Sequence, residues 1–258
     1  MFYKPNNYNK LIVLSLTTLL LTACGSENTP FSPLVALNKS SDYPTNELKL
    51  YVSVYGIADN ELYVSASIQD RNSENLKLDA LDKLTVSVDG TETDVIYSSG
   101  QYHTASIQHS TVISELSVTF SRDNALIASE RITKLPLPFT PTASYSNETI
   151  AVNWAVEDNV SYKLLGQALV CSNGQGDYRQ EALPELDGLP KDISSGQYSD
   201  TLNIVFGASE AQLVAGYDHC QVDMTITAKL SGVLPTTQGG NNITLDTGLK
   251  RSVTVTLK

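Results

Sequence analysis

LKLYVSVYGIADNELYVSASI, residues 48–68, is the stretch that decides the fold predicted by this sequence. Apolar side chains occupy every second position on both sides of Asp59 and Asn60, and these positions are Leu48, Leu50, Val52, Val54, Leu62, Val64, Ala66 and Ile68. Alternation with this period is typical of a strand that buries one face and exposes the other. The stretch therefore predicts two half-buried strands separated by a turn.

The same alternation recurs along the rest of the chain. Further strands are predicted at residues 84–88, 94–97, 102–107, 116–120, 125–132, 149–156, 163–171, 201–206, 219–229 and 251–257. Many short strands without a helical stripe are typical of β-sandwiches. Three prolines within residues 135–143 predict a stiff extended joint. We therefore expect an all-β protein with one sandwich at residues 47–134 and a second at residues 144–258.

The charge balance excludes one class of partner. The chain has 258 residues, of which 17 are basic and 28 acidic, and its formal net charge is −11. Binding to a phosphate backbone depends on Lys and Arg, so nucleic acid is not expected as a partner. A hydrophobic content of 41% is enough to fill folded cores.

The N-terminus has the outline of an export signal. Lys4 and Lys10 precede an apolar run at residues 11–23 that is too short for a stable membrane span. The run ends Leu21-Thr22-Ala23-Cys24, which resembles the lipobox of bacterial lipoproteins. That resemblance implies removal of residues 1–23 and a lipid on Cys24. Because Gly25 rather than Asp follows the cysteine, it also implies sorting to the outer membrane. Residues 24–46 are expected to be a flexible tether.

The remaining cysteines are assigned on the strength of that resemblance. If Cys24 is acylated, Cys171 and Cys220 are left as a pair in an oxidising compartment, and we expect a disulfide between them. Closing a loop of about 50 residues contributes roughly 4 kcal/mol in the chain-entropy model. A reactive or metal-binding thiol is the alternative.

The second half of the chain has a further resemblance. The strand Thr149-Ile-Ala-Val-Asn-Trp154 resembles an early core strand of fibronectin type III and other immunoglobulin-like domains, and residues 218–228 resemble their late central strand. The resemblance implies tandem immunoglobulin-like sandwiches with a buried Trp154. Unlike in antibody domains, Trp154 precedes both cysteines of the second domain.

Residues 172–199 are predicted to be mostly a long loop. Loops of this length in compact domains are often functional, and Tyr178, Arg179 and Glu181 mix aromatic and charged groups as interaction loops do. We consider these three residues a candidate binding site. A cover over a sheet edge is the alternative.

Metal and catalytic sites are not expected. Nine acids between residues 59 and 94 are compatible with loop-bound calcium or with a solvated face, and the solvated face is the simpler interpretation. The sequence lacks a nucleophile elbow, a phosphate loop and a dinucleotide glycine motif. The expectation is a non-enzyme that needs no cofactor beyond the lipid on Cys24.

The leading functional hypothesis is a structural or protein-interaction module of the cell envelope. It would be held by the lipid at the membrane and would bind another envelope or surface protein. A carbohydrate-binding or adhesive surface module is the first alternative, and it requires a row of exposed aromatic side chains, for which Tyr51, Tyr55 and Tyr63 are candidates. An accessory domain of an envelope enzyme is the second alternative.

Overall fold

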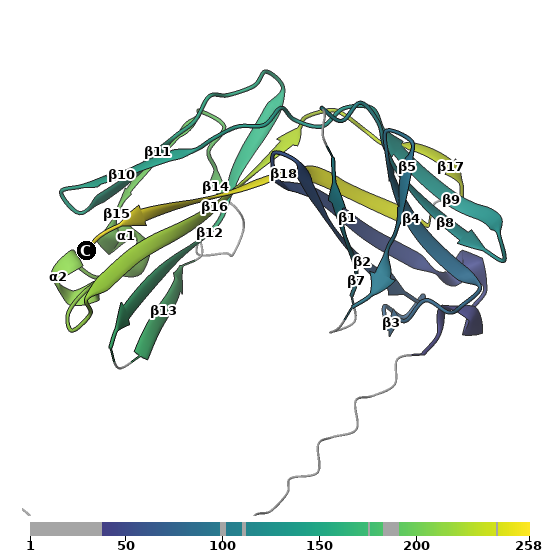
Figure 1. Cartoon of the computed structure of the whole chain (residues 1–258), viewed down its shortest axis with the longest axis horizontal. Helices are drawn as coiled ribbons and strands as arrows, with labels where there is room; N and C mark the ends of the chain where they lie inside the picture. The colour runs from purple at the N-terminus through teal and green to yellow at the C-terminus, as the bar shows by residue number, and fades with distance from the viewer. Residues whose placement is uncertain (1–37, 99–101, 110–111, 175, 183–190, 241) are drawn as a thin grey trace, which may run out of the picture. The chain divides into compact units, whose positions relative to one another are not determined.

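The computed structural model describes residues 38–98, 102–109, 112–174, 176–182, 191–240 and 242–258 (Figure 1). The predicted all-β sandwich fold is confirmed. The strands are β1 (Lys49–Ala58), β2 (Glu61–Gln69), β3 (Asn75–Leu76), β4 (Asp82–Val88), β5 (Thr91–Asp94), β6 (Ile96–Tyr97), β7 (His103–Gln108), β8 (Leu116–Arg122), β9 (Ala125–Ile132), β10 (Thr142–Ser146), β11 (Thr149–Asn153), β12 (Val160–Asn173), β13 (Gly176–Ala182), β14 (Lys191–Asp192), β15 (Gln197–Thr201), β16 (His219–Leu230), β17 (Thr236–Gly239) and β18 (Ile243–Thr256). Two short helices, α1 (Leu202–Phe206) and α2 (Glu210–Leu213), lie between β15 and β16.

The first sandwich packs two sheets around one core. One layer contains β1, β2, β7 and β6, and the other has the order β17-β9-β8-β4-β5. The alternating residues of the opening stretch, such as Leu50 and Leu62, are buried here together with Phe120 from the facing layer. The period-two pattern thus gave the correct buried face.

The second sandwich has its own core. The order β13-β12-β16-β18 forms one layer, and β10-β11-β15 forms the other. Trp154 is 8% exposed and packs beside Tyr162, with ring centroids 5.7 Å apart. β16 lies between β12 and β18, which is the central position expected for residues 218–228.

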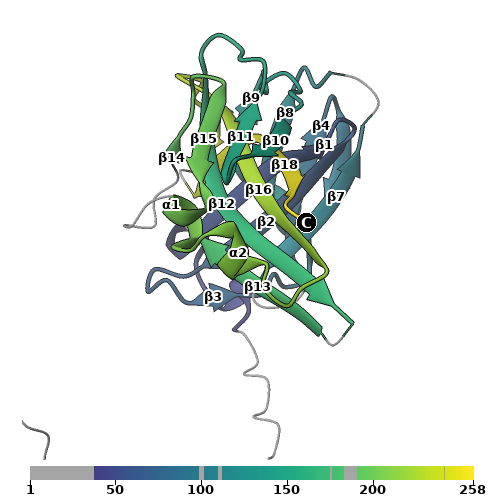
Figure 2. The ribbon, with the colours of Figure 1, turned by 90° about the vertical axis from the view of Figure 1, so that its left-hand side faces the viewer.

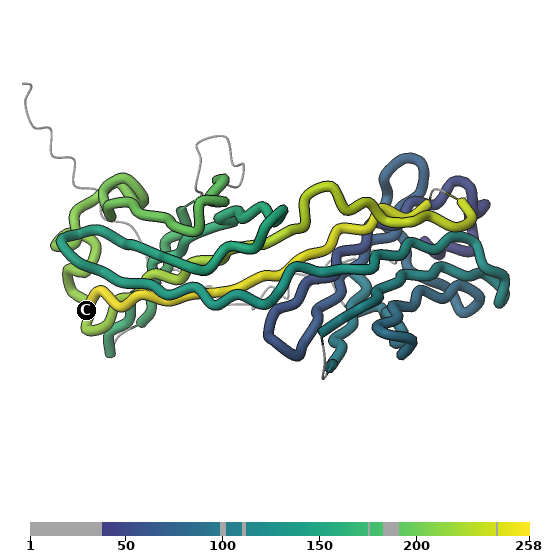
Figure 3. The backbone as a smooth tube through the Cα atoms, turned by 90° about the horizontal axis from the view of Figure 1, so that it is seen from above, coloured from purple at the N-terminus to yellow at the C-terminus, as the bar shows by residue number. Residues whose placement is uncertain are grey.

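Strand β18 belongs to both sandwiches. Its residues from Ile243 to Leu249 pair in parallel with β1. Those from Leu249 to Thr256 pair antiparallel with β16. The layer with β1 and the layer with β16 are therefore one ten-stranded sheet. Eight strands follow the order β13-β12-β16-β18-β1-β2-β7-β6, and β14 and β3 add to it by pairing with β12 and β2. Figure 3 shows β18 passing from one sandwich into the other.

This shared strand changes the expected domain boundary. The sequence placed all residues from 144 onward in the second sandwich, but β17 pairs with β9 and Ile243 is buried in the first core. The return of the chain to the first sandwich was not predicted, because the residue pattern of a strand does not specify which sheet the strand joins.

Tight turns set the register of several hairpins. Asp89 and Gly90 have φ values of 48° and 84° and join β4 to β5. Asp123 and Asn124 do the same between β8 and β9, with φ values of 52° and 63°. Two-residue turns with positive φ match the twist of paired strands, and Asn, Asp and Gly adopt them most easily.

Two local predictions in the second sandwich were wrong. Residues 202–206, expected to be a strand, form α1, because Thr201 caps the helix by accepting the N–H of Ile204 at 3.3 Å and Gly207 ends it in the left-handed region. Part of the predicted long loop at residues 172–199 forms β13, which pairs with β12 along its whole length.

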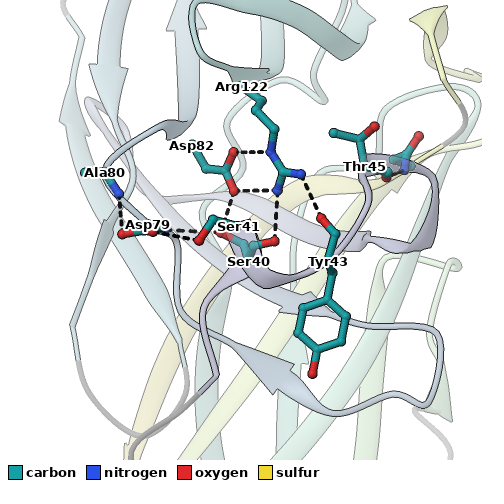
Figure 4. A network of polar contacts seen from close by, with 9 residues as sticks. Ser40, Ser41, Tyr43, Thr45, Asp79, Ala80, Asp82 and Arg122 are labelled. Carbon is teal, nitrogen blue, oxygen red and sulfur yellow. Dashed lines mark hydrogen bonds and ion pairs between the residues drawn. The ribbon is translucent and has the colours of Figure 1, made fainter.

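The last part of the predicted tether is folded. The guanidinium of Arg122 donates to both carboxylate oxygens of Asp82, at 2.6 and 2.8 Å, and to the carbonyls of Tyr43 and Ser40 (Figure 4). The hydroxyl of Ser40 also donates to Asp82, whose side chain is fully buried. Bidentate pairing of this kind is strong and directional. Residues 40–43 are therefore fixed to β4 and β8, whereas residues 24–37 lie outside the described part.

His103 is a buried titratable group in the first core. Its Nε2 accepts the backbone N–H of Leu78 at 3.2 Å, and its ring meets that of Tyr97 edge-on with centroids 5.4 Å apart. Burial, and secondarily the positive charge of Lys77, lowers the pKa of His103 from 6.5 to about 4. The folded protein therefore keeps this imidazole neutral at pH values where the unfolded chain protonates it.

We expect stability to fall between about pH 6.5 and pH 4 because of His103. Below pH 6.5 the unfolded chain binds a proton that the folded chain does not accept, so acid favours unfolding, by about 3 kcal/mol at the end of the window. Urea titrations across this range measure the effect. His103→Phe should reduce the fall in the free energy of unfolding between about pH 6.5 and pH 4. The exposed control His219→Gln should leave this fall unchanged. An unchanged slope in His103→Phe would exclude this assignment.

Candidate binding face

The outer face of the ten-stranded sheet carries exposed tyrosines near its shared strand. On β18 the odd-numbered side chains Ile243, Leu249 and Val255 are buried, so the even-numbered positions face outward. The neighbouring outward positions on β1 and β2 are rich in Tyr and Ser. We call the following set the tyrosine face: Tyr51, Ser53, Tyr55, Tyr63, Ser65, Ser67, Thr244 and Asp246.

The three tyrosines of this face differ in exposure. Tyr51 and Tyr63 are each 43% exposed, whereas Tyr55 is only 6% exposed. Tyr55 lies directly opposite Tyr63 in the β1–β2 ladder and opposite Gly248 in the β1–β18 ladder. A Cβ at Gly248 would lie 3.2 Å from the Tyr55 ring and 2.5 Å from the carbonyl oxygen of Ala228, so the glycine makes room for close packing here.

A charged cluster holds Tyr55 in place. Its hydroxyl donates to Asp246 at 2.5 Å, and the Lys250 ammonium lies 4.2 Å from its ring centroid. Lys229 forms an ion pair with Asp246 at 2.6 Å. Two ammonium groups and one carboxylate therefore surround the ring, which gives this part of an acidic protein a local excess of positive charge.

The electrostatics of the cluster keep Tyr55 a neutral donor. Burial, followed by the hydrogen bond to Asp246, raises the pKa of Tyr55 far above its usual value of 10. Burial also lowers the pKa of Lys250, and the charge of Lys229 acts in the same direction, whereas Asp246 opposes both. The arrangement supplies an aromatic and hydrogen-bonding surface rather than a group poised for proton transfer.

The structure separates the three residues of the predicted binding loop. Tyr178, Arg179 and Glu181 lie on β13, so the expectation of a loop was wrong. Arg179 and Glu181 share one side of the strand and form an ion pair at 3.1 Å, whereas Tyr178 faces the other side, where its ring lies 5.8 Å from that of Tyr217. No apolar alternation marks this strand in the sequence, which explains the error.

The predicted disulfide is confirmed. Cys171 and Cys220 are bonded, with Cα atoms 4.1 Å apart, at directly opposed positions of β12 and β16. Both are buried. The bond joins two neighbouring strands of one sheet, near the end of β12 and the start of β16. Cys24, the predicted lipidation site, lies outside the described residues.

The acids between residues 59 and 94 are dispersed in the structure. Asp82 binds Arg122, Asp94 pairs with Lys83 and Asp59 pairs with Arg251. In the part of the chain that the structure describes, no group of three His, Cys, Asp or Glu side chains is placed to hold a metal ion. Nor does any helix among these residues have the length and hydropathy needed to cross a membrane.

A cavity of about 230 Å³ opens beside the proline-rich joint. Its lining is mostly apolar and includes Leu62, Leu135, Pro136 and Leu249. The buried guanidinium of Arg251 donates to the carbonyl of Gly56 and to Asp59, each at 2.9 Å. The one carboxylate among the described residues that line this cavity, that of Asp59, is therefore paired with Arg251.

Comparison with known proteins gives no family. No family model matches the sequence, and no curated protein matches it. The adhesin InvE of Yersinia pseudotuberculosis is 15% identical with a TM-score of 0.25, and the match covers 83% of this chain and 59% of that chain. A candidate carbohydrate-binding protein of Bacteroides uniformis is 12% identical over 80% of this chain and 99% of its own, with a TM-score of 0.23. The Escherichia coli adhesin FdeC is 11% identical over 78% and 65% of the two chains, with a TM-score of 0.23.

Proposed function

We propose that this protein is a non-catalytic interaction module of the bacterial cell envelope. A lipid on Cys24 holds it at the outer membrane, and the tyrosine face binds another envelope or surface protein. The observation that carries the proposal is the presence of Tyr51 and Tyr63, each 43% exposed, among outward Ser and Thr side chains on a rigid sheet.

The composition of the face supports protein recognition. Tyrosine supplies a large amphipathic contact area at a low cost in side-chain entropy, and serine supplies adaptable hydrogen bonds, so both are frequent in protein-binding paratopes. Tyr55 adds rigidity, because its hydrogen bond to Asp246 and the nearby Lys250 fix its ring at the position directly opposite Tyr63. Sites on strands hold their geometry better than sites on loops.

Glycan binding is the second candidate for the same face. The exposed rings of Tyr51 and Tyr63 favour it, since sugars need accessible aromatic surfaces. The burial of Tyr55 weighs against it, because the expected row of three exposed aromatics is reduced to two. A protein partner is therefore the better-supported occupant.

Photocrosslinking in intact cells tests the proposal. Tyr51 and Tyr63 are replaced one at a time by p-benzoylphenylalanine in the full chain, and Leu126 on β9, which is 53% exposed on the other sheet, is the matched control. We expect both tyrosine positions, and not position 126, to capture the same second polypeptide, identified by mass spectrometry.

Two results would contradict this function. Equal capture from position 126, or no adduct from either tyrosine position, would remove the tyrosine face as the binding surface. An adduct that glycosidases shorten and that contains no second polypeptide would replace the protein partner with a glycan.

A further inference from the structure

Strand β13 ends the ten-stranded sheet. All seven of its residues pair with β12, from Gly176 opposite Asn173 to Ala182 opposite Gln167, without a register shift. Among the residues that the structure describes, no strand pairs with its other edge. Figures 1 and 2 show β13 at the margin of the sheet, beside β12.

This edge lacks the short length, the bulge and the proline that protect other edge strands against strand addition, and its charged side chains are Asp177, Arg179 and Glu181. Natural proteins shorten their edge strands, bend them with bulges or place proline in them, because an unpaired edge is a template for another strand. The other terminal strands in the described sheets are shorter, since β10 and β15 have five residues, β5 and β17 four, and β6 two. β13 has seven residues, with no proline and no bulge.

The charges on β13 complement a second β13. Arg179 and Glu181 share one side of the strand, and their side chains are 57% and 70% exposed. If two copies pair antiparallel about Gln180, each Arg179 lies opposite Glu181 of the other copy. Pairing centred on Arg179 or on Glu181 would instead place like charges opposite each other, which is unfavourable. Pairing centred on Tyr178 would place Arg179 opposite Asp177 of the other copy. The charge pattern therefore excludes the registers centred on Arg179 and Glu181 and leaves those centred on Gln180 and Tyr178, and a crosslink at position 180 identifies the first of these two.

We propose that β13 is a docking edge for a second copy of this chain, which adds its own β13 antiparallel about Gln180. The contact is isologous, as the closed symmetry of a dimer requires. Main-chain hydrogen bonds between the two edges supply the attraction, and in the register about Gln180 two Arg179–Glu181 pairs form between the copies. Each copy gives up its own exposed Arg179–Glu181 pair at little cost, because such pairs contribute little on a surface. This proposal does not depend on the ligand of the tyrosine face.

Cysteine crosslinking in membranes that contain the full chain tests the contact. In the proposed register the two Gln180 side chains are directly opposed, so Gln180→Cys should form a covalent dimer under mild oxidation, seen on a non-reducing gel. Ser144→Cys, an exposed position on the terminal strand β10, is the control and should form none.

Exchanging the charges at positions 179 and 181 in the Gln180→Cys variant distinguishes the proposed contact from random collision between copies. Arg179→Glu and Glu181→Arg each place like charges opposite each other twice, and each should lower the dimer yield about tenfold. The double exchange Arg179→Glu with Glu181→Arg should restore the yield, and so should co-expression of the two single variants. Equal yields from Ser144→Cys, insensitivity to the exchanges, or capture of a different protein would each overturn the proposal. These results are independent of crosslinking at Tyr51 and Tyr63.

Discussion

Deleting residues 236–258 is expected to unfold both sandwiches, and not only the second. The deletion removes β17 and β18, and with them the strands that pair with β9, β1 and β16. It also removes buried side chains from both cores, including Ile243 from the first and Val255 from the second. Full burial of such a side chain contributes about 1.5–3 kcal/mol, and folded proteins have only about 5–15 kcal/mol of stability.

Thermal unfolding followed by circular dichroism measures the effect of this deletion. We expect loss of the cooperative transition in the variant that ends at Pro235. A control that ends at Thr256, the last residue of β18, should retain the transition within a few degrees. A native-like transition in the variant that ends at Pro235, with the first sandwich intact, would show that residues 47–134 fold without the shared strand.

Replacing Cys24 with Ser is expected to release the protein from the membrane. A serine hydroxyl does not replace the thiol that receives the lipid in lipoproteins, so the variant lacks the acyl chains. Each buried methylene contributes about 0.8 kcal/mol to membrane binding, and several chains together hold a protein almost irreversibly. The expected change is therefore from nearly complete to negligible membrane association.

Detergent phase partition and labelling with a palmitate analogue measure this change. Wild-type protein should enter the detergent phase and carry the label, whereas Cys24→Ser should stay in the aqueous phase without label. Ser26→Ala, two residues further along the chain, is the control and should behave as wild type. If wild-type protein carried no label, or if Cys24→Ser still entered the detergent phase, the lipid anchor would be wrong.

The sequence predicted those features that depend on local alternation. Side chains such as Leu50 and Leu62 were assigned to the buried face because a strand has an exact period of two. The turn at Asp89 and Gly90 was also predictable, because these residues adopt positive φ easily. The disulfide followed from the number of cysteines and the expected compartment.

The features that the sequence did not predict depend on distant contacts. The partner of Ile243 in the parallel ladder is Leu50, 193 positions earlier, and no local pattern encodes that choice. Tyr55 was a candidate for an exposed row, but packing against Gly248 and Asp246 buries it. The strand at β13 was missed because its charged residues are typical of a loop.

Hydrogen exchange of the β18 amides tests the central structural claim, that one strand joins both sandwiches into the sheet that carries the tyrosine face. Paired backbone amides in a core sheet open only with large free energies. We predict that amides paired with β1, at residues 244–248, are protected as strongly as those paired with β16, at residues 250–256. Rapid exchange at residues 244–248 beside slow exchange at residues 250–256 would contradict the claim.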